Sequence, residues 1–174
     1  PVQYEGVTAE HLTVREAVGV FDVSHMGEFL VSGENALALI QKVTSNDASK
    51  LTPGKVQYSC LPNNTGGIVD DLLVYCLGES EYMLVVNASN MEKDWDWIQK
   101  HNTANVNMVD RSDEYSLLAI QGPKATAAIE SLTDLAIESM PYYTVQVGEF
   151  AGVEDVIVAT TGYTGSGGYE IYFK

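Results

Sequence analysis

The hydrophobic positions of the chain follow one order of elements, and that order occurs twice. A short apolar strand, a glycine and an amphipathic helix span residues 27–47, and the same pattern spans residues 115–135. Gly33 and Gly122 end the strand in each copy. After each glycine, apolar residues recur every three or four positions, which is the spacing of one helical face. The pattern therefore predicts a strand followed by a helix in both copies.

Three more strands are predicted after each helix, where short apolar runs are bounded by turn-forming residues. They cover residues 56–61, 67–76 and 82–87 in the first copy, and 143–150, 153–161 and 168–173 in the second. The glycine-rich stretches "NNTGG" and "GYTGSGG" are typical of tight reversals. The first copy continues into an N-capped helix over residues 89–101, with Met91, Trp95 and Ile98 on one face, and a last strand "NVNMVD".

These elements predict an α+β fold of two antiparallel-sheet lobes, each built from a repeated strand-helix-strand-strand-strand unit. We expect the first lobe to be discontinuous, over residues 1–26 and 112–174, and the second, a ferredoxin-like α+β unit over residues 27–111, to be inserted into it. The second copy stops at Lys174, where the first copy continues into a helix, and the chain does not begin with Met. The pattern therefore predicts a fragment, truncated at the C-terminal end of the first lobe.

Composition and charge exclude several classes of protein. Hydrophobic residues make up 45% of the 174 residues, which is enough to form a core. No apolar run approaches the roughly 18 residues that span a bilayer, and the start "PVQYEGVTAEHL" has neither the basic region nor the apolar stretch of a signal peptide. The net charge of -15 is spread along the chain, whereas nucleic-acid binding requires clustered Lys and Arg. We therefore expect neither a nucleic-acid partner nor a membrane.

The two cysteines, Cys60 and Cys76, lie in apolar strand-like stretches. Two cysteines inside strands are typical of buried thiols in a reducing compartment rather than of a disulfide. His11, His25 and His101 are scattered, so no Cys/His grouping has the spacing of metal ligands. We expect free thiols and no metal site.

The strand "GIVDDLLVYC" carries two adjacent aspartates in an otherwise apolar run. Alternation places Asp70 on a face with aliphatic residues and Asp71 on the face of Tyr75. A buried carboxylate costs several kcal/mol unless it is paired, hydrogen-bonded or protonated. Asp71 is therefore a candidate to line a site for an aromatic ligand. The alternative is that Asp70 is exposed at the strand entrance and Asp71 accepts backbone hydrogen bonds in the turn.

Tyrosine is over-represented, with ten residues against four phenylalanines. Rings with a hydrogen-bonding tip suit the wall of a pocket for a flat polar ligand, although tyrosine is also common in sheets. Glu170 points away from its apolar neighbours on its strand, and could accept two parallel N–H donors from an aminopyrimidine-like ring. The tyrosines on or beside the strands expected near Asp71 are Tyr58, Tyr75, Tyr142, Tyr143, Tyr163 and Tyr169.

Two motifs that suggest other chemistry are better explained structurally. Asp22, Ser24 and His25 lie within four residues, but a nucleophilic serine needs partners from separate parts of the fold and a strained glycine elbow. A turn or capping role is expected for Asp22 and Ser24. The stretch "TTGYTGSGGYE" lacks the Lys and the following helix of a phosphate-binding loop, which favours a hairpin.

Five motifs in this order resemble the tetrahydrofolate-dependent aminomethyltransferases, the T-proteins of the glycine cleavage system. The resemblance covers essentially the whole chain. "DVSHMG" in particular distinguishes these enzymes from related folate-binding scaffolds and oxidase domains, which share the fold. Members are about twice as long and carry a C-terminal β-barrel lobe. The resemblance therefore implies a truncated folate-binding T-protein fold without that barrel. The motifs are "GVFDVSHMGEFLVSG", "VTSND", "GKVQYSCLPNNTGGIVDDLLVY", "VVNASN" and "TTGYTGSGGYEIY".

The resemblance implies transfer of an aminomethyl group from the lipoyl arm of H-protein, with release of ammonia, to tetrahydrofolate, forming 5,10-methylenetetrahydrofolate. It places Asp71 beside the reacting N5 nitrogen of the folate as the catalytic residue. A carboxylate there orients N5, stabilises developing positive charge and helps to remove the proton. It also implies Leu30, Tyr58, Tyr75, Asn87, Tyr143 and Tyr163 around the pterin, with Glu170 at its amino-pyrimidine edge.

Two alternatives remain: a non-catalytic folate-binding scaffold of the same fold, and an α+β interaction module whose acidic surface meets a partner. Asp71 together with "DVSHMG" favours the enzyme. The acidic charge and the lack of transit-peptide features favour the bacterial cytoplasm, and in a eukaryote the mitochondrial matrix is expected. Family residues beyond position 174 are absent, so this fragment by itself is expected to fold without necessarily turning over.

Overall fold

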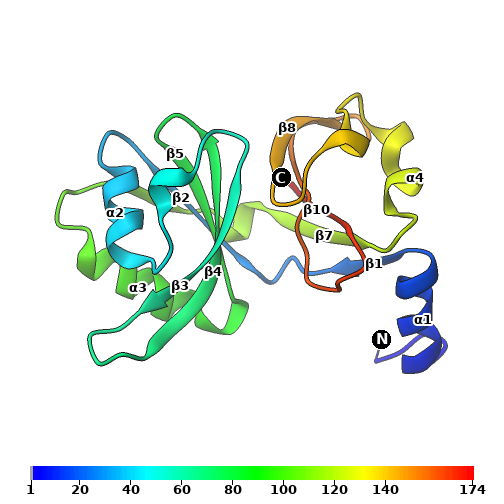
Figure 1. The fold of residues 1–174 in the computed structure, drawn as a ribbon, viewed down its shortest axis with the longest axis horizontal. Coiled ribbons are helices and arrows are strands. Elements are labelled where there is room, and N and C mark those ends of the chain that lie inside the picture. The colour runs from blue at the N-terminus through cyan, green and yellow to red at the C-terminus, as the bar shows by residue number, and fades with distance from the viewer. Residues whose placement is uncertain (1) are drawn as a thin grey trace. The chain divides into compact units, whose positions relative to one another are not determined.

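The computed structural model describes residues 2–174 and contains two compact units (Figure 1). Unit 1 comprises the chain up to Ser24 together with Ser116–Lys174, and unit 2 comprises His25–Tyr115. Pro1, where the expected first lobe begins, lies outside the described residues. Each unit holds one antiparallel five-stranded sheet with helices, so the predicted α+β class is confirmed.

Unit 2 contains the inserted copy of the repeat. Its sheet has the order β3-β4-β5-β2-β6, so β4 has a neighbour on both sides although β5 is the central strand. The strands and the two helices predicted for this copy of the repeat are confirmed. The elements are β2 (Gly27–Ser32), α2 (Ala36–Val43), η1 (Ala48–Lys50), β3 (Val56–Pro62), β4 (Ile68–Gly78), β5 (Glu81–Val86), η2 (Ala88–Asn90), α3 (Met91–His101), β6 (Asn107–Asp110) and η3 (Ser112–Glu114).

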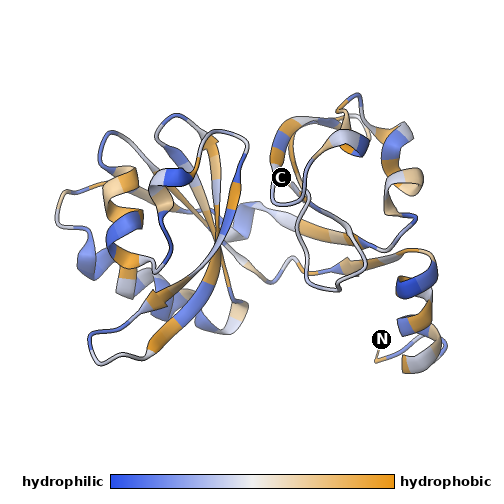
Figure 2. Cartoon of the chain, viewed as in Figure 1, coloured by the Kyte–Doolittle hydropathy of each residue, from blue (hydrophilic) through white to orange (hydrophobic). Residues whose placement is uncertain are grey.

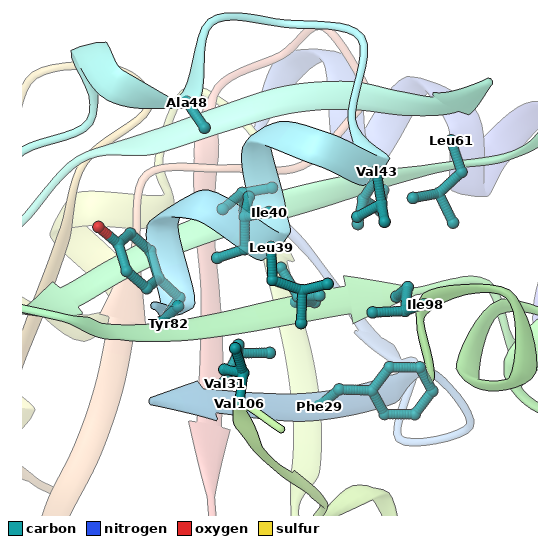
Figure 3. Close-up of a cluster of buried hydrophobic side chains, with 14 of the residues drawn as sticks. Phe29, Val31, Leu39, Ile40, Val43, Ala48, Leu61, Tyr82, Ile98 and Val106 are labelled. Carbon is teal, nitrogen blue, oxygen red and sulfur yellow. The ribbon is translucent and has the colours of Figure 1, made fainter. Parts of the chain in front are cut away.

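The core of unit 2 lies between one face of this sheet and the two helices α2 and α3. Leu39, Ile40 and Val43 of α2 are at most 5% exposed and lie over Phe29 and Val31 of β2 (Figure 3). From α3, Ile98 is fully buried, and Met91 and Trp95 pack against the same cluster, as their spacing predicts. Figure 2 shows hydrophobic residues concentrated on the strands and on one side of α2. The opposite face of the sheet does not take part in this core.

Unit 1 has a sheet of the order β1-β7-β10-β9-β8. Its core is formed by Ile120, Val158 and Ile171 of the sheet with Ile129 of α4 and Ile137 of η5. The elements are α1 (Val7–Glu16), β1 (Gly19–Asp22), β7 (Ser116–Gln121), α4 (Ala125–Ile129), η4 (Glu130–Leu132), η5 (Ile137–Ser139), β8 (Val145–Phe150), β9 (Val153–Ala159) and β10 (Gly168–Phe173).

The two sheets repeat one topology, as the sequence pattern predicts. β2, β3, β4 and β5 occupy the positions of β7, β8, β9 and β10, and β6 occupies the position of β1. The registers align over the central part of the sheets, and the β8–β9 pair shifts beyond Gly148. In unit 2, Tyr75 pairs with Met83 and Met83 with Leu30, and in unit 1, Ala159 pairs with Glu170 and Glu170 with Ala119. Leu30 and Ala119 each lie three residues before a positive-φ glycine, Gly33 or Gly122.

Three local expectations need correction. The expected N-cap of α3 makes no side-chain cap hydrogen bond, because the Asn90 side chain donates to Asp70 instead. Cys60, expected to be buried, is only partly buried, whereas Cys76 is buried, and both thiols are free. The elements α1 and β1 were not predicted. No residue of α1 is buried, so its sequence carries no core-facing stripe.

Candidate functional site

The paired aspartates of β4 lie on opposite faces of the sheet in unit 2. Leu72, Val74 and Cys76 belong to the core beneath the helices, and Asp70 shares their face. Tyr75 is fully buried on the other face, which is the face of Asp71. Both carboxylates are half-buried. The alternation expected from the sequence is therefore present, and each acid meets a different environment.

Asp71 accepts hydrogen bonds from two side chains. The Tyr58 hydroxyl donates to Asp71 Oδ2 at 2.6 Å, and Asn87 Nδ2 donates to Asp71 Oδ1 at 2.7 Å. Tyr58 stands on β3, diagonally across from Asp71, and its side chain is half-exposed. The hydrogen bond to the Asp71 carboxylate raises the pKa of Tyr58 to about 12. The phenol therefore keeps its proton at physiological pH and remains a donor to Asp71.

Asn87, the residue after β5, connects the two acids. Its Nδ2 donates to Asp71 Oδ1 and also approaches Asp70 Oδ1 at 3.1 Å and the Asp71 carbonyl oxygen at 3.2 Å. All three partners are acceptors, which fixes the orientation of the amide. Because Asn87 sits at a strand end beside β4, it reaches carboxylates of both sheet faces.

Asp70 lies beneath α3 in a cluster of polar side chains. Asn90 Nδ2 donates to Asp70 Oδ2 at 2.9 Å. Burial opposes ionisation of Asp70, but the hydrogen bonds from Asp94, Asn90, the Asp71 backbone and Asn87 outweigh it and lower its pKa. Asp94 of α3 is fully buried. Burial, and next the hydrogen bond with Asp70, raise the pKa of Asp94 to about 7.

The same sheet face as Asp71 carries an apolar row and one more acid. Leu30, Met83 and Tyr75 pair across β2, β5 and β4; Leu30 is partly exposed and the other two are buried. Glu28 of β2 is 1% exposed, and its Oε2 has no hydrogen-bond partner. Burial, and next the charge of Asp110, raise the pKa of Glu28 to about 8. Glu28 is thus a neutral carboxylic acid at pH 7.

The remaining predicted site residues belong to unit 1. Glu170 accepts a hydrogen bond from the Thr161 hydroxyl, and the Tyr172 hydroxyl lies 3.5 Å from it. Tyr143 has φ of 61°, and burial raises the pKa of its phenol. Tyr163 is fully exposed. The structure therefore brings Leu30, Tyr58, Asp71, Tyr75 and Asn87 together on unit 2, and Tyr143, Tyr163 and Glu170 stand on unit 1.

Two further tyrosines of the expected wall have other surroundings. Tyr169 is a core residue of unit 1. Its hydroxyl is hydrogen-bonded to the Thr126 hydroxyl and donates to the Ile137 carbonyl oxygen. Tyr142 packs edge to face on Tyr143. Asp22 caps a turn by accepting from the Ser24 backbone N–H, as expected.

Sequence reasoning missed Asp94, Asn90 and Glu28. Asp94 could have been found, because it stands three residues after Met91 and four before Ile98, on the apolar face of α3. An acid in a core-facing stripe requires a partner or a proton. Glu28 follows the "DVSHMG" motif on a six-residue strand, and nothing in the sequence alone distinguishes it from an exposed residue.

Two hollows in the described residues lie away from Asp71. One of about 110 Å³ is lined in unit 2 by Asn35, Leu39, Lys42 and His101 among others. The other, of about 260 Å³, is lined in unit 1 by Gly122, Thr126, Thr160 and Tyr169 among others. Residues 2–174 contain no group of three or more His, Cys, Asp or Glu arranged to hold a metal ion, and no helix long and apolar enough to cross a membrane.

Comparison with known proteins gives one consistent result. The family described as "GCVT N-terminal domain" matches residues 1–174. The chain is 71% identical over 174 residues to an aminomethyltransferase of Flavobacterium psychrophilum, covering 100% of the chain and 48% of the relative. It is 59% identical over 173 residues to an aminomethyltransferase of Bacteroides thetaiotaomicron, covering 99% of the chain and 48% of the relative. The chain spans about half the length of the curated relatives it matches.

Solved structures give the same fold. The crystal structure of the glycine cleavage system aminomethyltransferase T from Bartonella henselae matches with a TM-score of 0.87 and 33% identity, over 97% of this chain and 45% of that one. A heterotetrameric sarcosine oxidase from Corynebacterium matches with a TM-score of 0.65 and 16% identity, over 95% of this chain and 82% of that one. The second match shows a shared fold alone.

Proposed function

The chain belongs to the GCVT N-terminal domain family of the glycine cleavage system, and from this premise we propose that it is part of a tetrahydrofolate-dependent aminomethyltransferase. The protein would accept an aminomethyl group from the lipoyl arm of H-protein, release ammonia and form 5,10-methylenetetrahydrofolate. Its curated relatives are bacterial, and we propose that it works in the bacterial cytoplasm. The expected T-protein fold is shared with the Bartonella enzyme.

We propose Asp71 as the catalytic residue. The observation that carries this role is its pair of donors, Tyr58 and Asn87, at 2.6 and 2.7 Å. Both hydrogen bonds hold the orientation of the carboxylate. A fixed carboxylate within hydrogen-bond distance of the folate N5 would orient that nitrogen, stabilise the charge that develops on it and accept its proton.

The surroundings of Asp71 suit a flat ring with polar edges. Leu30, Met83 and Tyr75 form an apolar row on the same sheet face, four residues along β4 from Asp71. A pterin combines an apolar ring face with hydrogen-bonding nitrogens, so an apolar wall beside a carboxylate matches its chemistry. We propose Leu30, Tyr58, Tyr75 and Asn87 as residues that bind or align the folate.

Glu170, Tyr143 and Tyr163 are proposed as further folate-binding residues on the strength of the family motif. Glu170 is half-buried and already accepts from Thr161, so its carboxylate has a fixed orientation toward incoming N–H donors. Tyr163 is fully exposed and free to pack on a ligand. The amino-pyrimidine edge of the pterin is the group that a carboxylate binds with two parallel hydrogen bonds.

A non-catalytic folate-binding scaffold is the alternative. The likeness to a sarcosine oxidase shows that the fold occurs in proteins other than aminomethyltransferases, so the fold alone does not decide between the two. The two proposals differ in what Asp71 does. A scaffold would bind folate without needing a proton acceptor at that position, whereas the transferase requires one.

The experiment uses the protein at the length of its curated relatives, called the full-length protein below. Turnover of glycine with lipoylated H-protein and tetrahydrofolate is measured for wild type and Asp71→Asn, with folate affinity measured by calorimetry. We expect Asp71→Asn to lower kcat about 10²- to 10⁴-fold while folate still binds. Asp155→Asn is the matched control, because Asp155 is the residue of β9 that aligns with Asp71 by residue count and is exposed. Normal turnover by Asp71→Asn would eliminate the catalytic role and favour the scaffold.

A further inference from the structure

Asp94 is a buried acid that the proposed reaction does not use. It lies on the sheet-facing side of α3, it is 0% exposed, and neither carboxylate oxygen has a hydrogen-bond donor as partner. An ionised carboxylate in that position would cost several kcal/mol, because nothing replaces the water it has lost. Asp94 therefore needs either a proton or a cation.

The charged groups around Asp94 favour a proton. Asp70 of β4 is its hydrogen-bonding neighbour and Asp71 adds a further negative charge, so both disfavour a second ionised acid. Lys93, the neighbouring residue on α3, is the one cation whose charge acts in the opposite direction, and its ammonium group donates to the Val69 carbonyl oxygen at 2.7 Å. Two carboxyl groups in contact share one proton, and the more buried group keeps it. Asp94 is that group.

The proton gives Asp70 a complete set of donors. A protonated Asp94 would donate its hydroxyl to Asp70. Asn90 donates to Asp70 Oδ2 at 2.9 Å, and Asn87 approaches Asp70 Oδ1 at 3.1 Å. Asn87 also makes its shorter bond, 2.7 Å, to Asp71 Oδ1. The amide of Asn87 is therefore the physical link between the buried acid pair on one face of the sheet and Asp71 on the other.

We propose that Asp94 is a positioning residue: it holds the proton of the Asp70–Asp94 pair, and the pair in turn fixes the Asn87 amide against Asp71. The proposal rests on the catalytic role proposed for Asp71. No bond is made or broken in this step. Loss of the proton would place two negative charges side by side beneath α3, displace Asp70 and release Asn87 from the orientation that holds Asp71.

The direction of the pH effect follows from the shared proton. Burial and Asp70 hold the pKa of Asp94 at about 7, well above its value in an unfolded chain. The folded protein therefore keeps the pair protonated at low pH and loses this stabilisation as pH rises from about 4 through about 7. An asparagine at position 94 donates to Asp70 at every pH. The Asp94→Asn variant should therefore keep the Asn87 amide in place across the pH range in which wild-type Asp94 loses its proton.

The test compares Asp94→Asn and Asp94→Leu with wild type in the full-length protein, with Asp96→Asn on the exposed side of α3 as control. We expect Asp94→Leu to lower kcat about tenfold with KM for tetrahydrofolate within twofold of wild type. Asp94→Asn should restore kcat to within twofold at pH 6. The ratio of kcat in Asp94→Asn to kcat in wild type should rise severalfold between pH 6 and pH 9, and the difference in melting temperature should rise with it. Asp96→Asn should leave both ratios flat.

A flat kcat ratio and a flat melting difference for Asp94→Asn would overturn the proposal. Wild-type kcat in a folded Asp94→Leu would also overturn it. If Asp94→Leu does not fold, the pH ratios of Asp94→Asn decide alone. The proposed function fails separately, when Asp71→Asn keeps normal turnover. An inactive Asp71→Asn combined with flat Asp94→Asn ratios removes the positioning role and leaves the catalytic role of Asp71 standing.

Discussion

Units 1 and 2 share one sheet topology, and they differ at the position of the paired acids. Counted back along the strands from the equivalent residues Tyr75 and Ala159, Asp70 and Asp71 of β4 align with Glu154 and Asp155 of β9, where the β8–β9 register shifts. In unit 2 the acids are half-buried and hydrogen-bonded to Tyr58, Asn87 and Asn90. In unit 1 both acids are exposed, beside the turn of the β8–β9 hairpin.

The difference arises from the residues around that shared position. The counterpart of Tyr58 in unit 1 is Val147, which has no hydroxyl to donate. In unit 2, β5 continues through Asn87 into η2 and α3, and these cover the end of β4. The duplicated sheet therefore supplies a scaffold, while the strand-end amide, the tyrosine and the covering helix create the candidate site.

Removing the acid from each unit tests this comparison with the largest expected effect. Asp71→Asn should lower kcat of the full-length protein about 10²- to 10⁴-fold, because the variant cannot accept a proton. Asp155→Asn should leave kcat unchanged, because that carboxylate is exposed, and asparagine tolerates the positive φ of 58° at this position. Equal losses in the two variants, measured by steady-state turnover, would mean that sheet position rather than local surroundings determines the role.

The paired glycines test how differently the two repeats are packed. A Cβ on Gly122 would lie 2.3 Å from the Ala17 carbonyl oxygen, whereas a Cβ on Gly33 would meet nothing within 4 Å. Both residues have positive φ, which costs an alanine roughly 1–2 kcal/mol. We expect Gly122→Ala to cost about 2 kcal/mol more than Gly33→Ala, because backbone must move. Urea unfolding of both variants measures the difference, and equal midpoints would contradict it.

Glu28 and its counterpart Leu117 place an ionisable and an apolar side chain at one buried position. The pKa of Glu28 is raised to about 8, so wild-type stability falls as pH rises from about 4.5 to about 8. Glu28→Gln carries no titrating group. Its stability relative to wild type should therefore increase across that window, by on the order of 2 kcal/mol, and stay constant on either side. Unfolding at several pH values measures this, with the exposed Glu79→Gln as control.

Tyr58→Phe gives the smallest expected effect. It removes the hydrogen bond to Asp71 and makes unit 2 resemble unit 1, where Val147 has no hydroxyl. Since Asn87 still holds the carboxylate and Tyr58 is half-exposed, we expect kcat to fall only about three- to tenfold, the value of one ordinary hydrogen bond. Turnover measured beside Tyr4→Phe, an exposed tyrosine near the start of the chain, separates this from a general loss of phenols.

Much of the fold followed from periodicity. The strands of both sheets were predictable because each combines an apolar run with a glycine-rich or polar boundary, as in β3, β4 and their "NNTGG" turn. Helix α1 was not, since none of its residues is buried. Helix α4 is shorter than its apolar spacing predicted: it ends at Ile129 and continues as the single turn η4.

The candidate site was predictable in part. Alternation separated Asp71 from Asp70, and the family motif identified Tyr58 and Asn87, which the structure places on the Asp71 carboxylate. The partners of Asp70 were not found, because Asn90 and Asp94 lie inside the predicted helix over residues 89–101 and were not singled out there. Their role depends on how closely α3 approaches β4. That distance is set by packing, including Gly27, where a Cβ would lie 2.7 Å from the Met91 side chain.

The chain enters and leaves unit 2 through two strands that are neighbours. β2 and β6 pair from Phe29 opposite Asp110, and in unit 1 the flanking ends pair too, with Asp22 opposite Leu118. Excising the insert would thus leave two cut ends one strand spacing apart, and a short reverse turn could rejoin them. Dividing the gene at these two points would express each unit as a separate polypeptide. The acid network of unit 2 could then be studied without unit 1.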